Sequence, residues 1–229
     1  MVDNVLHAPE GDVHFHLRVP DGYDAATPHS LFVTLPGSQG LYFQGVGVNL
    51  QTENFAFAAP SYRDDMIIVA PQLNDWGQTS ADQTIALVEH LLTRYTIDRS
   101  HVFLEGYSGG GETASLAAAT RPDLFCAVLH CASQWDGDLA AVADARLPVR
   151  LVVGERDEYY GAEPDRSSYD RLVSLYTTQG LDNSEIARLA VLDIKTSSYF
   201  SDRGASDQHG AGNTLFAQDR EIMGWLFDR

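Results

Sequence analysis

A short glycine-rich turn carries the strongest chemical signal in this sequence. Residues 106–110, Gly-Tyr-Ser-Gly-Gly, fit the pattern G-x-S-x-G between an apolar run at 101–106 and a stretch of small residues with helical character. In that context the serine, Ser108, occupies a strained strand-to-helix turn from which its hydroxyl can act as a nucleophile. The pattern is common, so a catalytic interpretation also requires an acid and a base in suitable positions.

Phosphate binding is the other chemistry that a glycine-rich loop can indicate, and it fits poorly here. A Walker loop needs a lysine to contact the β- and γ-phosphates, whereas this chain has Glu112 where positive charge would help. The dinucleotide pattern G-x-G-x-x-G does not match in register either.

Candidates for the acid and the base follow Ser108 in order. Asp157 lies three residues after the apolar run 149–154, and Glu155 and Glu158 are the alternative acids. His209, in the polar stretch 204–213, is the only histidine beyond Asp157. In such a set the imidazole takes the serine proton and the carboxylate orients the imidazole.

Four other titratable residues have structural explanations. His130 lies inside an apolar run and is predicted to be a core histidine, and His14 and His16 share one face of a strand. Glu105 precedes the turn within a strand, where burial of its charge requires a hydrogen-bonding partner.

Apolar runs alternate with helical patterns along the whole chain, which indicates a parallel sheet wrapped by helices. The first run has period two and predicts an N-terminal antiparallel strand. No linker or repeat interrupts the series, so residues 1–229 are expected to form a single α/β domain. The predicted strands are residues 12–20, 30–37, 66–72, 101–106, 127–131, 149–154 and 190–194.

Helices are expected where apolar residues recur every three to four positions. Ser80 and Gln83, three residues apart, predict a capping box at the start of the first long helix. A further helix follows the glycine-rich turn and ends before Pro122. The other predicted helical segments are residues 80–98, 165–179, 184–189 and 213–227.

The order Ser…Asp…His is the order found in α/β-hydrolases. From Asp12 to its end the chain resembles that superfamily, and in particular compact dienelactone-hydrolase-like and polyhydroxybutyrate-depolymerase-like esterases and prolyl-oligopeptidase catalytic domains. The stretch 16–37, HLRVPDGYDAATPHSLFVTLPG, resembles the strand–turn–strand entry of that group. The resemblance implies an eight-stranded, mostly parallel sheet with its active site at the carboxyl edge. No long insertion follows residues 127–131, so no large lid domain is expected.

The resemblance also implies an oxyanion hole made by two backbone amides, those of Ser38 and Gly109. The chain departs from the usual His-Gly pair after the third strand, since residues 35–38 read Leu-Pro-Gly-Ser. Backbone donors do not depend on the missing imidazole, so the turn is still expected to supply one amide. The candidate substrate-binding residues are Gln39, Tyr107, Trp76 and Trp135, with core packing as the alternative for the two tryptophans.

These features together predict a serine carboxylic-ester hydrolase that forms an acyl-enzyme and acts on short-chain or aromatic esters. A serine peptidase, a thioesterase or a lactonase of the same fold is the alternative activity. A non-catalytic binding protein is the alternative from another class. The chemistry requires no metal and no organic cofactor.

Composition limits the partners of the protein. With 15 Lys and Arg against 32 Asp and Glu, the net charge is −17 at pH 7, which disfavours nucleic acid and anionic membranes. No apolar run approaches the roughly 20 residues that span a bilayer. The first twelve residues have no basic and apolar leader pattern, so a cytoplasmic location is expected. The expected partner is a small-molecule ester, and the sequence leaves the oligomeric state open.

Overall fold

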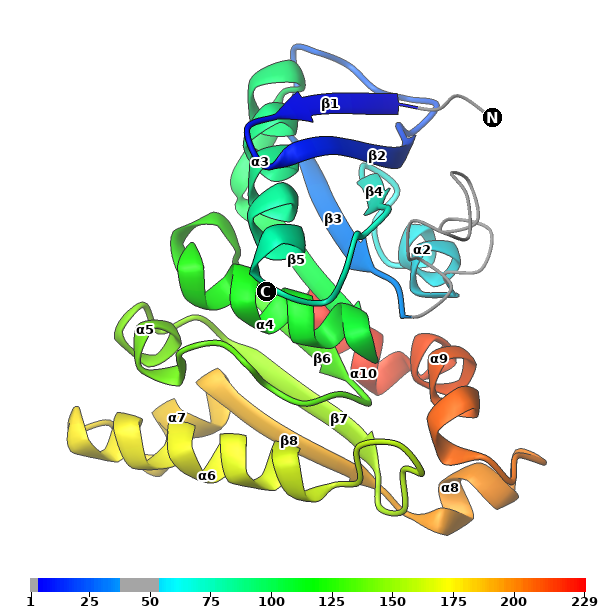
Figure 1. Ribbon diagram of the computed structural model, residues 1–229, viewed down its shortest axis with the longest axis vertical. Helices are drawn as coiled ribbons and strands as arrows, with labels where there is room; N and C mark the ends of the chain where they lie inside the picture. The colour runs from blue at the N-terminus through cyan, green and yellow to red at the C-terminus, as the bar shows by residue number, and fades with distance from the viewer. Residues whose placement is uncertain (1–3, 38–53) are drawn as a thin grey trace.

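The fold is built on an eight-stranded β-sheet, as expected, in the computed structural model, which describes residues 4–37 and 54–229 (Figure 1). The strand order is β1-β2-β4-β3-β5-β6-β7-β8. β2 pairs antiparallel with β1 and β4, and the remaining pairs are parallel. The strands are β1 (Asn4–Ala8), β2 (Gly11–Arg18), β3 (His29–Leu35), β4 (Ile67–Pro71), β5 (Ile97–Tyr107), β6 (Ala127–Cys131), β7 (Val149–Gly154) and β8 (Ala190–Lys195).

The central strands are buried on both faces, which explains their near-continuous apolar sequences. Every residue of β3, β4, β6 and β7 is buried. Parallel strands covered by helices on both sides have this composition because neither face meets water. β1 alternates between half-buried and exposed residues at the edge of the sheet, and its five-residue sequence did not predict it.

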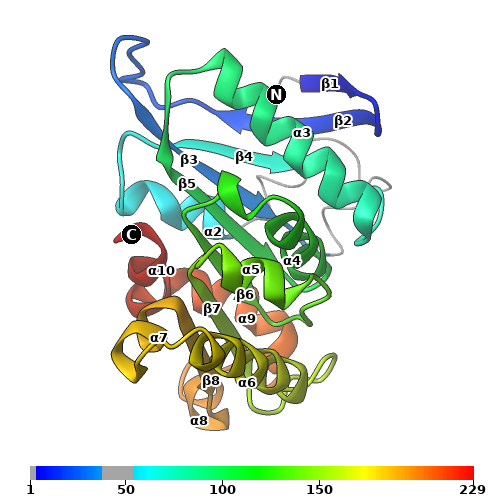
Figure 2. The ribbon, with the colours of Figure 1, turned by 90° about the vertical axis from the view of Figure 1, so that its left-hand side faces the viewer.

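Helices cover both faces of the sheet (Figure 2). One apolar core lies under α3 to α7, and a second lies under α2, α8, α9 and α10. Within the described ranges, no helix combines the length and the apolar character needed to cross a membrane. The helices are α2 (Asn54–Ala58), α3 (Gln78–Arg94), α4 (Gly109–Thr120), α5 (Leu139–Asp144), α6 (Glu163–Thr178), α7 (Asn183–Leu189), α8 (Ser197–Ser201), α9 (Gln208–Gln218) and α10 (Arg220–Phe227), with short 3-10 turns at Ala59–Ser61 and Pro122–Leu124.

The predicted capping box of Ser80 and Gln83 is wrong. The first long helix, α3, begins two residues earlier and has Gly77 as its N-cap, without a side-chain cap. The Ser80 hydroxyl instead accepts hydrogen bonds from the amides of Asn74 and Asp75, at 3.2 and 3.1 Å. Gln83 Oε1 accepts the side-chain amide of Asn74 at 3.2 Å. Both Ser80 and Gln83 therefore fix the preceding loop, a tertiary role that the spacing alone does not reveal.

The C-terminal region also differs from the prediction. The expected helix at 213–227 is two helices, because the Asp219 carboxylate accepts the amides of Glu221 and Ile222 and starts α10 as its N-cap. The first of the two, α9, begins at Gln208, so His209 lies in its first turn and not in a loop.

Candidate functional site

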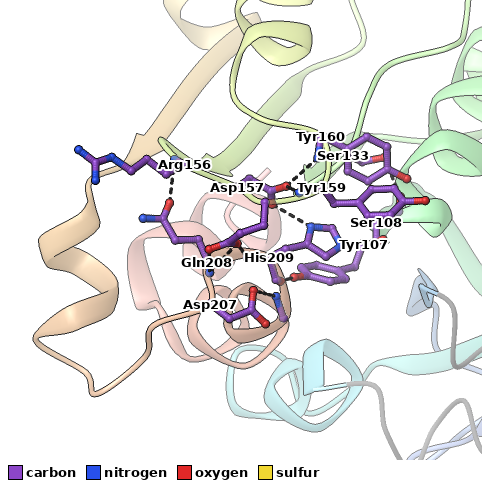
Figure 3. Close-up of polar contacts among 12 residues, drawn as sticks. Tyr107, Ser108, Ser133, Arg156, Asp157, Tyr159, Tyr160, Asp207, Gln208 and His209 are labelled. Atoms are coloured by element: carbon purple, nitrogen blue, oxygen red, sulfur yellow. Dashed lines mark hydrogen bonds and ion pairs between the residues drawn. The ribbon is translucent and has the colours of Figure 1, made fainter.

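The carboxyl edge of the sheet brings together three residues that are far apart in the sequence. Ser108 follows β5, Asp157 follows β7, and His209 lies in α9 after β8. The Ser108 Oγ lies 3.1 Å from Nε2 of His209, and Nδ1 of His209 lies 2.8 Å from Oδ2 of Asp157 (Figure 3). These contacts form one continuous hydrogen-bonded line from the hydroxyl to the carboxylate.

Ser108 has a backbone conformation that L-residues rarely adopt. Its φ and ψ are 54° and −128°, and surrounding hydrogen bonds hold it there. Its amide donates to the Cys131 carbonyl at 2.9 Å. Its own carbonyl accepts the Gly111 amide at 2.8 Å and the Ser133 hydroxyl at 2.6 Å. The turn that presents the hydroxyl is thus fixed from two neighbouring segments.

The glycines around Ser108 are required by close packing. A Cβ at Gly106 would overlap the backbone of Gly110, and a Cβ at Gly110 would overlap the carbonyl oxygen of Leu35 at the end of β3. A Cβ at Gly109 would overlap the indole ring of Trp76. The sequence G-x-S-x-G is therefore a steric requirement of a turn packed between β3 and the start of α4.

Asp157 is buried and held by backbone amides. Its Oδ1 accepts the amides of Tyr159 and Tyr160, at 3.0 and 2.8 Å, which leaves Oδ2 for His209. Burial favours a higher pKa for Asp157, but the hydrogen bonds from His209, Tyr160 and Tyr159 outweigh it and lower the pKa below the ordinary value. The carboxylate is therefore ionised where His209 needs an acceptor.

The alternative acids have other partners. Glu155 accepts the amide and the hydroxyl of Ser197, at 2.7 and 2.6 Å. The Glu158 Oε2 accepts the amides of Gln208 and His209, both at 2.9 Å. Neither carboxylate contacts the imidazole, whereas Asp157 does. Glu158 acts on the backbone of the candidate base, a role that its position one residue after Asp157 did not indicate.

Glu158 and Gln208 join the acid loop to the helix that carries the base. Gln208 is buried, and its Oε1 accepts the amide of Arg156 at 2.9 Å. Arg156 and Glu158, the residues before and after Asp157, are therefore both hydrogen-bonded to the first turn of α9. We expect Glu158→Ala to lower kcat for ester hydrolysis by about tenfold with little change in KM, because it loosens the geometry of the base.

Glu158→Gln is the partner variant for that measurement, since its amide oxygen can still accept one of the two bonds and should restore part of kcat. Glu163→Ala, an exposed glutamate at the start of α6, is the control and should behave as the wild type. Equal kcat values for Glu158→Ala and wild type would show that the Glu158 carboxylate does not position His209.

Aromatic residues surround the imidazole of His209 (Figure 3). The Tyr159 ring is 70% exposed and stacks on the imidazole with centroids 5.4 Å apart, and the Tyr160 ring lies 5.7 Å away. Tyr107 is buried, and its hydroxyl donates to the His209 carbonyl oxygen. Its contacts place Tyr107 beneath the imidazole. Among the aromatic neighbours, Tyr159 offers the most open ring.

The two candidate tryptophans differ in their neighbours. Trp76 is half-buried and packs against Gly109, directly beside Ser108. Trp135 is half-buried and packs on the ring of His130, with centroids 5.3 Å apart. Of the two, Trp76 therefore lies against the glycine-rich turn, and Trp135 lies over a buried histidine.

Of the predicted oxyanion donors, Gly109 begins α4, where the first N–H groups have no acceptor within the helix and can bind an anion. Ser38 and Gln39 lie outside the described residues. β3 ends at Leu35 beside the turn, so the chain leaves the sheet close to Ser108: a Cβ at Gly37 would lie 3.2 Å from the Ser108 Cβ.

Two buried groups near the site have structural partners. His130 is fully buried, as predicted, with Nδ1 3.4 Å from Oδ1 of the equally buried Asp165. Glu105 accepts the Thr34 hydroxyl at 2.6 Å within the sheet.

The chain is similar to several known proteins. Residues 72–175, just under half of the chain, match the prolyl oligopeptidase family. The probable feruloyl esterase C of Aspergillus flavus is 30% identical over 129 residues, which are 51% of this chain and 45% of that protein. The chain therefore spans less than half of this curated relative.

Solved structures resemble the whole described fold. A thermostable esterase superposes with a TM-score of 0.80 and 20% identity, covering 99% of this chain and 62% of that one. Oligopeptidase B from Leishmania major gives a TM-score of 0.60 at 15% identity, covering 98% of this chain and 36% of that one. At these identities the likeness concerns the fold, and the activity must be argued from the site.

Proposed function

We propose that this chain, which has the fold of the α/β-hydrolases, is a serine hydrolase that cleaves carboxylic esters. The observation that supports this most is the hydrogen-bonded line of Ser108, His209 and Asp157 at the carboxyl edge of the sheet. The proteins it resembles, which include esterases and an oligopeptidase, agree with hydrolysis of an acyl bond.

Acylation begins with the attack of the Ser108 Oγ on the ester carbonyl carbon. As the new C–O bond forms, the hydroxyl proton moves to Nε2 of His209, and Asp157 stabilises the imidazolium through Nδ1. The carbonyl electron pair moves to its oxygen, which the Gly109 amide stabilises by about 3 kcal/mol, in the proposed role of one oxyanion donor. The second donor is proposed to be the amide of Ser38.

Collapse of the tetrahedral intermediate expels the alcohol, which takes the proton from the His209 imidazolium. A water molecule then attacks the acyl-enzyme by the same route: His209 takes its proton, and the proton returns to Oγ of Ser108 as the acid leaves. No step requires a metal or an organic cofactor, because the three side chains supply the nucleophile, the base and the orienting charge.

We propose short-chain or aromatic esters as substrates. Tyr159 and Trp76 provide flat surfaces close to Ser108, and aromatic faces bury a large area with little loss of side-chain freedom. A long acyl chain needs an extended apolar cover worth about 0.8 kcal/mol per methylene. The described residues show no lid domain over the site.

The test is the dependence of kcat/KM on the acyl group, for p-nitrophenyl acetate, butyrate, octanoate and palmitate and for methyl ferulate. We expect kcat/KM to fall beyond roughly eight acyl carbons, because methylenes left in water contribute nothing to binding. Tyr159→Ala should reduce kcat/KM for methyl ferulate about tenfold more than for the acetate, which serves as the internal control. A steady rise to palmitate would contradict the proposed substrate class.

A serine peptidase is the second candidate, because residues 72–175 match the prolyl oligopeptidase family. Peptide p-nitroanilides assayed beside the esters separate the two activities. If kcat/KM for an anilide exceeds that for the ester of the same acyl group, the peptidase assignment replaces the esterase assignment.

A further inference from the structure

A half-buried carboxyl group lies one helical turn beyond Ser108. Glu112 is in the first turn of α4, and four residues advance a helix by about one full turn, so Ser108 and Glu112 share one side of its N-terminal end. The Glu112 Oε1 accepts the hydroxyl of Tyr160 at 2.7 Å. Tyr160 is itself fixed, because its amide donates to Asp157 at 2.8 Å.

The Tyr160 side chain connects this carboxylate to the catalytic residues. Its ring lies 5.7 Å from the imidazole of His209, measured between centroids, and its hydroxyl donates to Glu112. Side chains four residues apart on a helix lie about 6 Å apart at their Cβ atoms, which places Glu112 at about that distance from Ser108. A substituent two or three bonds from a scissile carbonyl lies inside that distance.

The charge of Glu112 is not neutralised by a basic side chain. Within residues 4–37 and 54–229, Glu112 forms no ion pair with lysine or arginine, and residues 1–3 and 38–53 contain neither type. Burial raises the pKa of Glu112, and the hydrogen bond from Tyr160 opposes that rise. Of the titratable neighbours, Asp136 is acidic and His130 already faces Asp165. A group bound at Ser108 therefore meets an uncompensated negative charge, on a protein whose net charge is −17.

We propose that Glu112, held by Tyr160, is a specificity-determining residue that selects ester substrates by charge. It disfavours an anionic group close to the scissile carbonyl and favours neutral or cationic groups at the same place. The inference rests on the proposed esterase function and names the substrate class of that site. At about 6 Å, Coulomb's law with an effective dielectric constant between about 20 and 80 gives a discrimination between about threefold and hundredfold.

The experiment compares three methyl esters that differ in charge: monomethyl succinate (anionic), methyl levulinate (its neutral isostere) and methyl 4-(trimethylammonio)butyrate (cationic). kcat/KM is measured for the full chain at pH 8 and low ionic strength, for wild type and Glu112→Gln. In the variant, the ratio of kcat/KM for the anionic ester to that for the neutral ester should rise about tenfold. The ratio for the cationic ester should fall, while the neutral ester changes by less than about threefold.

Glu163→Gln is the matched control, because it removes one exposed glutamate from another helix and changes the net charge by the same amount. Its ratios should equal those of the wild type. Tyr160→Phe removes the hydroxyl that holds the carboxylate, and should shift both ratios in the direction of Glu112→Gln by a smaller factor. Added salt should weaken the wild-type discrimination.

Unchanged ratios in Glu112→Gln, with normal hydrolysis of methyl levulinate, would overturn the charge selection and leave the esterase function standing. Equal shifts in Glu112→Gln and Glu163→Gln would also overturn it, since the selection would then come from the overall charge. A wild-type protein that hydrolyses no ester in either panel would instead refute the proposed function, and the inference with it.

Discussion

Replacing Ser108 with alanine should lower ester turnover by at least about 10³-fold and leave the fold intact. The hydrogen-bonded line from Asp157 through His209 ends at this hydroxyl. Such residues act as a unit, so removing one of them loses most of the joint rate enhancement. The turn itself is held by the backbone of Ser108, so its side chain can be shortened without changing the packing. Turnover of p-nitrophenyl acetate and thermal unfolding are the two measurements.

Ser167→Ala provides the control, because this serine is exposed on α6 and should retain full activity. Near-wild-type turnover by a Ser108→Ala preparation free of contaminating esterases would show that another group is the nucleophile.

The second large effect concerns the base. kcat/KM should rise with pH through a single ionisation, because His209 must be neutral to accept the Ser108 proton. His209→Ala should remove that dependence and lower kcat/KM by at least about 10³-fold. The measurement is a pH profile from 5 to 9 with an ester that does not ionise in that range.

Protonation of Asp157 does not explain the loss of rate at low pH. The pKa of Asp157 is lowered in the folded state, so its stabilising contribution is complete above its unfolded pKa of about 3.9 and disappears only as the pH falls through the folded value. That window lies below the range of the profile. His90→Ala, an exposed histidine on α3, should keep the wild-type profile. If His130→Ala abolished the dependence with its fold preserved, His209 would not be the base.

The sequence predicted those site residues that directly follow a strand of the sheet. Ser108 and Asp157 follow long apolar strands, and parallel strands place their carboxyl ends at one edge, so their proximity could be inferred before any coordinates. His209 could be identified because it is the only histidine after Asp157. Its place in a helix was missed, because the glycines and polar residues of 204–213 favour a loop when tertiary contacts are unknown.

The remaining features depend on contacts between distant segments, which local patterns do not specify. Glu158 accepts the backbone amide of His209 across 51 residues of sequence, and Glu112 accepts the hydroxyl of Tyr160 across 48. Ser80 matched a capping pattern, yet its hydroxyl binds the loop before the helix. In each case the side chain forms a hydrogen bond with a backbone or carboxyl group that folding brings near. The spacing of residues in the sequence does not indicate such a contact.

The most direct test of the central claim, that Ser108 is an activated nucleophile, is covalent labelling with a fluorophosphonate followed by peptide mass mapping. The account predicts one adduct per chain on Ser108, formed rapidly by the native protein, strongly slowed in His209→Ala and absent from Ser108→Ala and from heat-denatured protein. No adduct on the native chain, or an adduct on another residue, would contradict it.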